Sequence, residues 1–360
     1  MMRYVPILKT RDAELRGIEN LAENVKDATT PLWELTKSRR TKKNLDGKIE
    51  RRLEKIYQIF GKRTFGLDLT SFIDLKNNEI LKLFKNDNDF DAWVTFLKQQ
   101  KKTFLRLLPT LLISDADSAK QYIAMHKEET RKICESFDKY IYRVNLGYHD
   151  LKFDLDNIFR DQKIQPTVLL DMEYVRKNTE DRYAQRAVAE LKTITDAGIN
   201  EIILAGCSFP QSPTEGGGEE IGTHQCVEID IYNFCKKGFP NLIYGDYATI
   251  HPLPNERAGG QGWIPRIDFP FSVSDSISIR YHRVRKNPNE KSYSPAYIRV
   301  AEKVVKDRDF IRLRRQLGES NWGIRQICMA SEGYPPALNP AFWISVRINL
   351  FIALRQITLR

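Results

Sequence analysis

The sequence predicts an α/β fold, specifically a (β/α)₈ barrel of the TIM-barrel type followed by a C-terminal extension of loops and helices. Short apolar runs precede longer amphipathic stretches about eight times within the first 250 residues, which is typical of βα units around a parallel sheet. A barrel of this kind takes roughly 250 residues. After residue 250 the chain becomes rich in proline and glycine. We therefore expect residues 1–250 to form the barrel and residues 251–360 to pack on it without a core of their own. An open, doubly wound sheet is the alternative, and the number of units favours closure.

The strands are predicted from short apolar runs that are bounded by polar or turn residues. The eight expected strands span 4–10, 30–36, 64–70, 107–115, 139–147, 166–174, 201–209 and 241–249. Helices are predicted where apolar residues recur at helical spacing, as Leu15, Ile18, Leu21 and Val25 do. The expected barrel helices span 12–27, 46–60, segments up to 104, 118–137, 150–161, 181–197 and 225–236.

The region beyond residue 250 has a different pattern. Residues 251–270 are predicted to form a long loop, and residues 276–286 alternate like an antiparallel or edge strand. Three further helices are expected at 295–306, 320–330 and 340–357.

Composition excludes several classes of protein. No segment approaches the ~20 apolar residues of a membrane helix, so a soluble cytoplasmic protein is expected. The five cysteines are odd in number and widely spaced, which argues against a disulfide framework or a structural zinc site. The GxGxxG fingerprint and the Walker loop are absent, and the glycine run at 216–218 is predicted to be a flexible turn.

The net charge of +10 makes polyanions such as nucleic acid plausible partners. Much of the positive charge lies in the runs at 37–43, 283–286 and 312–315. These runs form either a phosphate-binding face or a solvated basic surface. Aromatic residues do not interleave them, as a stacking platform for bases would require. A protein partner is the other expectation, and a membrane partner is not expected.

Ionisable or polar residues close most of the predicted strands at equivalent depth. They are Lys9, Glu34, Asp68, Asp115, Arg143, Asp171, Glu173, Ser208 and Asp246. In (β/α)₈ enzymes the active site lies at this end of the strands, and acids inside buried strands need partners. Side chains alternate along a strand, so Asp171 and Glu173 share a face, as do Gly66 and Asp68. A small residue below a polar one would leave room for a ligand.

Several chemistries could use such a ring of polar groups. Glu34, Asp68, Asp171 and Asp246 could hold Mg²⁺ or Mn²⁺ while Lys9 and Arg143 grip a phosphoryl group. A carboxylate pair could instead serve as acid and base for a glycosidic bond. His251, just past the last strand, is the histidine best placed for proton transfer. The alternative without function is a structural network of salt bridges at the barrel rim.

Several motifs also carry a resemblance to a known family. YVPILKTRDAE (4–14), TPLWELT (30–36), AGCSFP (205–210), YGDYATIHP (244–252) and NPAFW (339–343) with LRQ (354–356) resemble the beta family proteins. That family is named for a phage beta protein and has phage and bacterial members. The resemblance runs the full length, and it implies one barrel-like family unit in a phage or antiviral defence context. It implies no reaction. The family pattern has histidines after an asparagine near the C-terminus, whereas this chain has Asn349-Leu350-Phe351.

The sequence thus favours a phage- or defence-associated barrel protein with a polar, anion-binding pocket. If it is an enzyme, metal-assisted phosphodiester hydrolysis is the leading hypothesis, with Glu34, Asp68, Asp171 and Asp246 as metal ligands or base. The rival hypothesis is a non-enzymatic module that binds nucleic acid or a protein in phage–host conflict.

Overall fold

The computed structural model describes residues 2–42, 44–211, 219–253 and 263–359. The chain divides into two compact units, each made of several segments. The first unit comprises Met1–Arg11, Thr29–Gly206 and Ile231–Asp246, and the second comprises Asp12–Ala28, Cys207–Asp230 and Tyr247–Arg360. The predicted division into residues 1–250 and 251–360 follows the linear order of the chain and stays a prediction.

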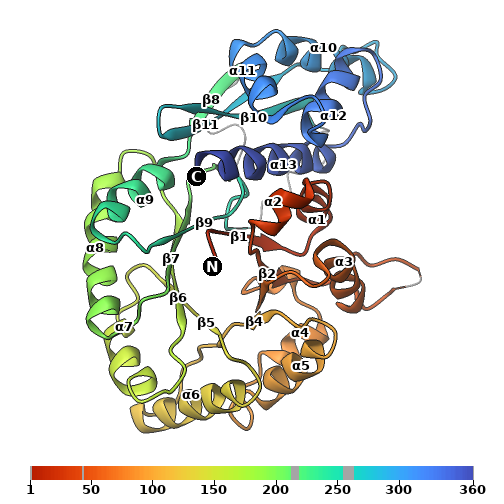
Figure 1. Ribbon diagram of the computed structural model, residues 1–360. Coiled ribbons are helices and arrows are strands. Elements are labelled where there is room, and N and C mark those ends of the chain that lie inside the picture. The colour runs from red at the N-terminus through yellow and green to blue at the C-terminus, as the bar shows by residue number, and fades with distance from the viewer. Residues whose placement is uncertain (1, 43, 212–218, 254–262, 360) are drawn as a thin grey trace. The chain divides into compact units, whose positions relative to one another are not determined.

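The first unit is built around a (β/α)₈ barrel, which confirms the predicted fold class. Among the described residues, eight parallel strands pair in the order β4-β3-β2-β1-β9-β7-β6-β5. A bridge between Thr110 and Ile141 joins β4 to β5 and closes the ring. Figure 1 shows β4 and β5 as neighbours. Each predicted strand corresponds to one of these. They are β1 (Tyr4–Lys9), β2 (Leu32–Leu35), β3 (Phe65–Leu69), β4 (Leu107–Pro109), β5 (Ile141–Asn145), β6 (Thr167–Tyr174), β7 (Ile202–Cys207) and β9 (Ile243–Asp246).

Helices surround this ring of strands (Figure 1). They are α3 (Glu50–Phe60), α4 (Asn78–Leu83), α5 (Asp91–Lys101), α6 (Ala119–Cys134), α7 (Leu151–Asp154), α8 (Glu180–Asp196) and α9 (Val227–Gly238), with a 3₁₀ turn at Ile73–Leu75 and a π-helical turn at Leu155–Phe159. Each long helix buries one apolar stripe against the strands. In α3 this stripe is Leu53, Ile56, Ile59 and Phe60.

Alternation along the strands separates the barrel interior from the helix layer. Trp33 of β2 packs on Phe60 of α3, so Trp33 faces outward and its neighbours Leu32 and Glu34 face inward. Gly66 of β3 also faces inward, because a Cβ there would lie 2.6 Å from Leu32 Cδ1 and 3.0 Å from Ile141 Cδ1. The space beside Gly66 is thus filled by apolar side chains, and the expectation that this glycine leaves room for a ligand is wrong.

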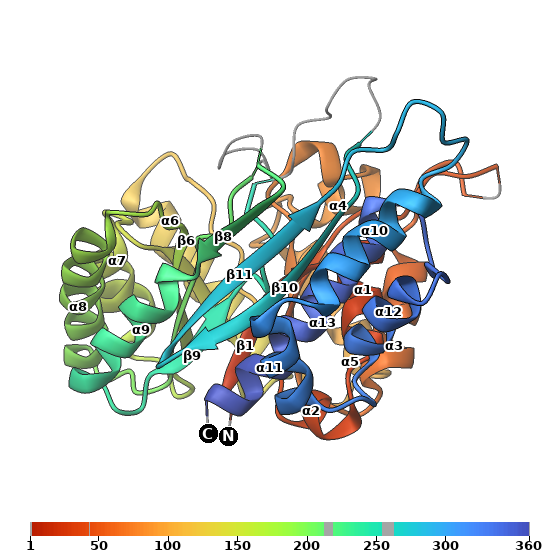
Figure 2. The ribbon, with the colours of Figure 1, turned by 90° about the horizontal axis from the view of Figure 1, so that it is seen from above.

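The second unit combines a small antiparallel sheet with helices. Its described strands pair in the order β10-β11-β8, and Figure 2 shows α10, α11 and α13 beside β10 and β11. Its elements are α1 (Asp12–Glu19), α2 (Glu23–Asp27), β8 (Ile221–Gln225), β10 (Arg266–Val273), β11 (Ser276–Arg283), α10 (Ser294–Val305), α11 (Arg308–Leu317), α12 (Trp322–Ser331) and α13 (Pro340–Thr358). Helix α13 is buried on nearly all sides and contacts α1, α12 and β10. The unit therefore has an apolar interior, which the sequence did not predict.

Three elements of the second unit were not predicted. Strand β10 overlaps the predicted loop at 251–270, because it contains Asp268 and Pro270. Strand β8 has no buried apolar face that would mark it as a strand. Helix α11 contains the predicted basic run at 312–315 and buries two apolar side chains, Phe310 and Leu313. The glycine run 216–218, Lys43 of the first basic run, and residues 254–262 of the predicted loop lie outside the described residues. Among the described residues, none of the helices combines the length and apolar character needed to cross a membrane.

Candidate functional site

Three carboxylates from three strands converge on one guanidinium at the C-terminal ends of the barrel strands. Arg143 Nη1 donates to Glu34 Oε1 at 2.7 Å and to Asp68 Oδ2 at 2.9 Å. Arg143 Nε and Nη2 both donate to Asp171 Oδ2, at 3.0 and 2.8 Å. The guanidinium therefore ties β2, β3 and β6 to β5 from inside the barrel.

Strand register places these side chains at one level. Glu34 is the Cα partner of Lys9 on β1 and of Asp68 on β3, and Asp171 is the partner of Asn145 on β5. Neighbouring residues at matched positions of parallel strands point to the same face. Three of the predicted polar positions, Lys9, Glu34 and Asp68, are thus brought together by strand pairing, and Arg143 of β5 links them to Asp171 of β6.

Lys9 completes the cluster of charged groups. Its Nζ lies 3.1 Å from Glu34 Oε2, and both side chains are buried. Lys9, Arg143, Glu34, Asp68 and Asp171, hereafter the strand-end cluster, have a formal charge of −1 when all are ionised. The side chain of Arg143 is 17% exposed whereas that of Asp171 is fully buried. A ligand at the strand ends would therefore meet the guanidinium before the carboxylates.

The surroundings shift the pKa values of two neighbouring carboxyl groups, those of Glu34 and Asp68, in opposite directions. Burial alone would raise the pKa of Glu34, but Lys9 and Arg143 outweigh it and lower this pKa to about 2. Burial raises the pKa of Asp68, with a further contribution from the Glu34 charge, and Arg143 opposes it only in part. Paired acids with diverging pKa values are a feature of acid–base sites.

Glu173 joins the cluster through Asp171. Its backbone N–H donates to Asp171 Oδ1 at 2.8 Å, and its φ of 51° lies in the left-handed region that non-glycine residues rarely adopt. The side chain is exposed, and its pKa is raised by partial burial and by the Asp171 charge. Glu173 is one of the predicted strand-end acids, but nothing in the sequence distinguishes it from the buried ones. Backbone strain of this kind is common at functional sites.

Two predicted site residues lie elsewhere. Tyr244 of β9 packs on Tyr232 of α9, so Tyr244 and Asp246 face the helix layer, and Asp246 accepts hydrogen bonds of 2.8 and 3.1 Å from the Tyr4 hydroxyl. His251 belongs to the second unit, where its side chain is buried and its Nδ1 accepts a hydrogen bond from Leu253 N at 3.1 Å. Asp246 therefore points to the helix layer and not to the strand-end cluster, and its role at a site stays a prediction.

The oxygen donors of the strand-end cluster suit a hard cation such as Mg²⁺ by their chemistry. However, Arg143 Nη1 already lies between Glu34 and Asp68, and Asp246 faces away from both. Within the described ranges, no group of three or more His, Cys, Asp or Glu side chains is arranged to hold a metal ion. The set Glu34, Asp68, Asp171 and Asp246 stays a prediction as metal ligands, and a cation there would have to displace the guanidinium.

The fold and the cluster define a (β/α)₈-barrel protein with a buried ionic centre at its strand ends. The chain belongs to the Beta protein family, whose model matches residues 4–355. It is 24% identical to Protein beta of Enterobacteria phage P4 over 355 residues, which covers 97% of this chain and 91% of that protein.

Two solved structures also align with most of the chain. The spore cortex-lytic enzymes SleL of Bacillus megaterium QM B1551 and Bacillus cereus each have a TM-score of 0.36, with 10% and 9% identity. Both alignments cover 97% of this chain and 74% of the other. Similarity at this level does not relate the chemistry of SleL to this chain.

Proposed function

We propose that the strand-end cluster is the active site of a hydrolase that acts on a phosphodiester, in the context of phage–host conflict. The observation that carries the proposal is the convergence of Glu34, Asp68 and Asp171 on the partly exposed Arg143. Burying a charged side chain costs free energy unless the charge is paired and hydrogen-bonded. Their position at the C-terminal ends of the strands is where (β/α)₈ enzymes have their active sites.

The roles follow from exposure and charge. Arg143 is the partly exposed cation that an incoming substrate phosphate would meet. Four of its five N–H groups already donate to Glu34, Asp68 and Asp171, so it would attract the phosphate by its charge. Glu173 is the proton-transfer candidate, since its carboxyl is exposed and its pKa is raised. Asp171 is a positioning residue that holds both, through Oδ2 to Arg143 and Oδ1 to the Glu173 backbone.

The basic loop after β2 supports the proposal that the substrate is a polyanion. Arg39, Arg40 and Lys42 are exposed on it, and it follows the strand that carries Glu34. A bridge between Thr41 and Asn44 shapes this loop. Exposed basic side chains on the loop that follows β2 would raise the local concentration of a polymer of phosphates. The phage context rests on the similarity to a phage protein.

The test is a nuclease assay on single- and double-stranded DNA and RNA, with Mg²⁺, Mn²⁺ or EDTA. Asp171→Asn and Glu173→Gln should each abolish cleavage while circular dichroism and the unfolding midpoint show a folded protein. Asp196→Asn, at an exposed acid in the last turn of the outer helix α8, is the matched control and should cleave normally. Cleavage that persists in EDTA would assign the chemistry to the side chains, and cleavage that needs Mn²⁺ or Mg²⁺ would favour the metal-assisted form. Full activity of both Asp171→Asn and Glu173→Gln would refute the proposal.

A second candidate is a non-enzymatic module that binds nucleic acid. The observation that favours it is the internal pairing of the cluster, in which Lys9 and Arg143 are each bonded to carboxylates, as in a structural network. Binding to DNA or RNA that weakens steeply with salt, without turnover in any metal, would select this reading.

A further inference from the structure

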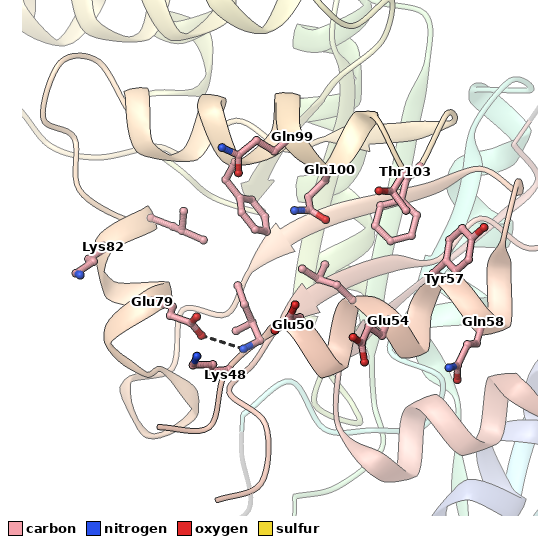
Figure 3. Close-up of a pocket in the computed structure, with 15 residues that line it drawn as sticks. Lys48, Glu50, Glu54, Tyr57, Gln58, Glu79, Lys82, Gln99, Gln100 and Thr103 are labelled. Atoms are coloured by element: carbon pink, nitrogen blue, oxygen red, sulfur yellow. Dashed lines mark hydrogen bonds between the residues drawn. The ribbon is translucent and has the colours of Figure 1, made fainter. Parts of the chain in front are cut away.

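A groove of about 730 Å³ lies on the outer side of the barrel unit, between α3 and α5 with α4 at one end. Figure 3 shows the two helices facing each other across it. Its apolar lining is Ile49, Leu53, Tyr57, Leu83, Phe96 and Phe104. Tyr57 is 51% exposed, and its ring centroid lies 6.0 Å from that of Phe104. The volume falls within the roughly 300–1,000 Å³ range of small-molecule sites.

The charged groups of the groove are distributed unevenly. Glu50 and Glu54 lie one turn apart on the α3 wall (Figure 3), and both are exposed. Within the described part of the chain, no hydrogen bond or ion pair of either side chain is recorded. The α5 wall across from them has uncharged polar groups, Gln99, Gln100 and Thr103.

The basic residues of the groove lie toward its other end. Lys48 lies near Glu79, and Lys82 points away from the groove (Figure 3). Glu79 is engaged by the backbone, since its Oε2 accepts from Ile49 N at 2.9 Å. The part of the groove between Glu54, Tyr57 and Gln100 is therefore aromatic and anionic, in a chain whose net charge is +10.

We propose that this groove binds a compact organic cation with an apolar body. The aromatic rings of Tyr57 and Phe104 would contact the apolar body and attract the positive charge through their faces, and Glu50 and Glu54 would neutralise it. The amide oxygens of Gln99 and Gln100 are acceptors for any N–H group of the ligand. This site is independent of the strand-end cluster and of the hydrolase proposal.

The test uses two probes of the same shape and opposite charge, tetraphenylphosphonium and tetraphenylborate, titrated into the full chain by calorimetry. The overall charge of the protein favours the anion, so saturable one-to-one binding of the cation would report a local anionic site. We expect such binding for tetraphenylphosphonium, with weakening by salt. Equal or tighter one-to-one binding of tetraphenylborate that depends on Tyr57 would overturn the proposal, as would no binding of the cation.

Variants locate the site. The double variant Glu50→Gln/Glu54→Gln should weaken cation binding about tenfold, because it removes the two negative charges of the α3 wall. Tyr57→Ala should weaken it comparably through lost ring contact. The control Glu302→Gln/Glu332→Gln changes the net charge by the same amount at exposed positions of the second unit and should bind as the parent does. Unaltered binding in both groove variants, or equal loss in the control, would refute the assignment.

Discussion

Glu34 and Asp68 are Cα partners on adjacent strands, and both accept a hydrogen bond from the same Nη1 atom of Arg143. The two carboxyl groups nonetheless differ in the number of cations that pair with them. Glu34 also has Lys9 at 3.1 Å, so two cations stabilise its ionised form, whereas Asp68 shares one cation with two other carboxylates. Their pKa values therefore move in opposite directions, and this difference can be measured.

Glu34→Gln should lower the free energy of unfolding at neutral pH and have little effect near pH 2. The pKa of Glu34 is lowered from 4.5 to about 2 by folding, so its stabilisation is present above pH 4.5 and is lost as the pH falls toward 2. A shift of this size corresponds to roughly 3 kcal/mol at pH 7. Urea unfolding of both proteins between pH 2 and pH 7 measures it. A difference that does not shrink with falling pH would contradict the assignment.

Asp68→Asn should instead raise the free energy of unfolding at neutral pH. Folding raises the pKa of Asp68, so the folded protein holds a proton that the unfolded chain releases, and stability falls as the pH rises through this raised value. The neutral asparagine removes that loss. Its single side-chain oxygen can still accept from Arg143, although the bond that Leu69 N donates to Asp68 Oδ1 at 2.8 Å is given up. We expect a higher urea midpoint than the parent at pH 7 and a similar one below pH 3.8. A destabilised variant at pH 7 would show that the ionised carboxylate is net favourable in place.

Glu173→Gly should increase stability and abolish any hydrolase activity. Glu173 has a φ of 51°, and a left-handed backbone costs a non-glycine residue about 1–2 kcal/mol. Glycine removes this cost together with the exposed carboxylate. The control is Ser274→Gly in the turn between β10 and β11, where φ is 52°, which should also increase stability yet leave activity unchanged. Loss of stability in Glu173→Gly would mean that the side chain, and not strain, dominates at this position.

The barrel could be predicted because its signals are local. Each strand is a short apolar run, and the polar residue at its end is visible in the sequence at Glu34, Asp68 and Asp171. The outward facing of Asp246 could not be predicted, because alternation alone does not show which face of a strand points inward. The strand also ends at Asp246 and not at residue 249. Positive φ values at Ala248 and Thr249 begin a turn there. In the structure Gly245 faces inward, because a Cβ there would meet Ala205 and Ile203. The next residue, Asp246, therefore faces outward.

Other features depend on contacts between distant residues, which periodicity does not report. The sequence marked Arg143 as one strand-end residue among several, but its central position results from reaching across the barrel to Glu34 on β2 and Asp68 on β3. The amphipathic pattern of residues 12–27 predicts one helix but not its partner, and the structure has two helices there, α1 and α2. In the structure α1 packs on α13 within the second unit, because Gly17 allows Ile348 and Ser345 to approach closely.

The same helix contact yields a prediction at Asn349, which is fully buried in α13. Its Nδ2 donates to Gly17 O of α1 at 3.1 Å, and its Oδ1 accepts from Gly323 N of α12 at 3.2 Å. Asn349→Leu would leave both backbone groups buried without this partner, and each such loss costs about 1–3 kcal/mol. We expect the free energy of unfolding to fall by about 3 kcal/mol, measured by urea denaturation. The control Asn200→Ala removes an exposed side chain that bonds Gly198 O and should change stability by no more than about 0.5 kcal/mol. A comparable effect of the two substitutions would show that Asn349 does not bridge the three helices.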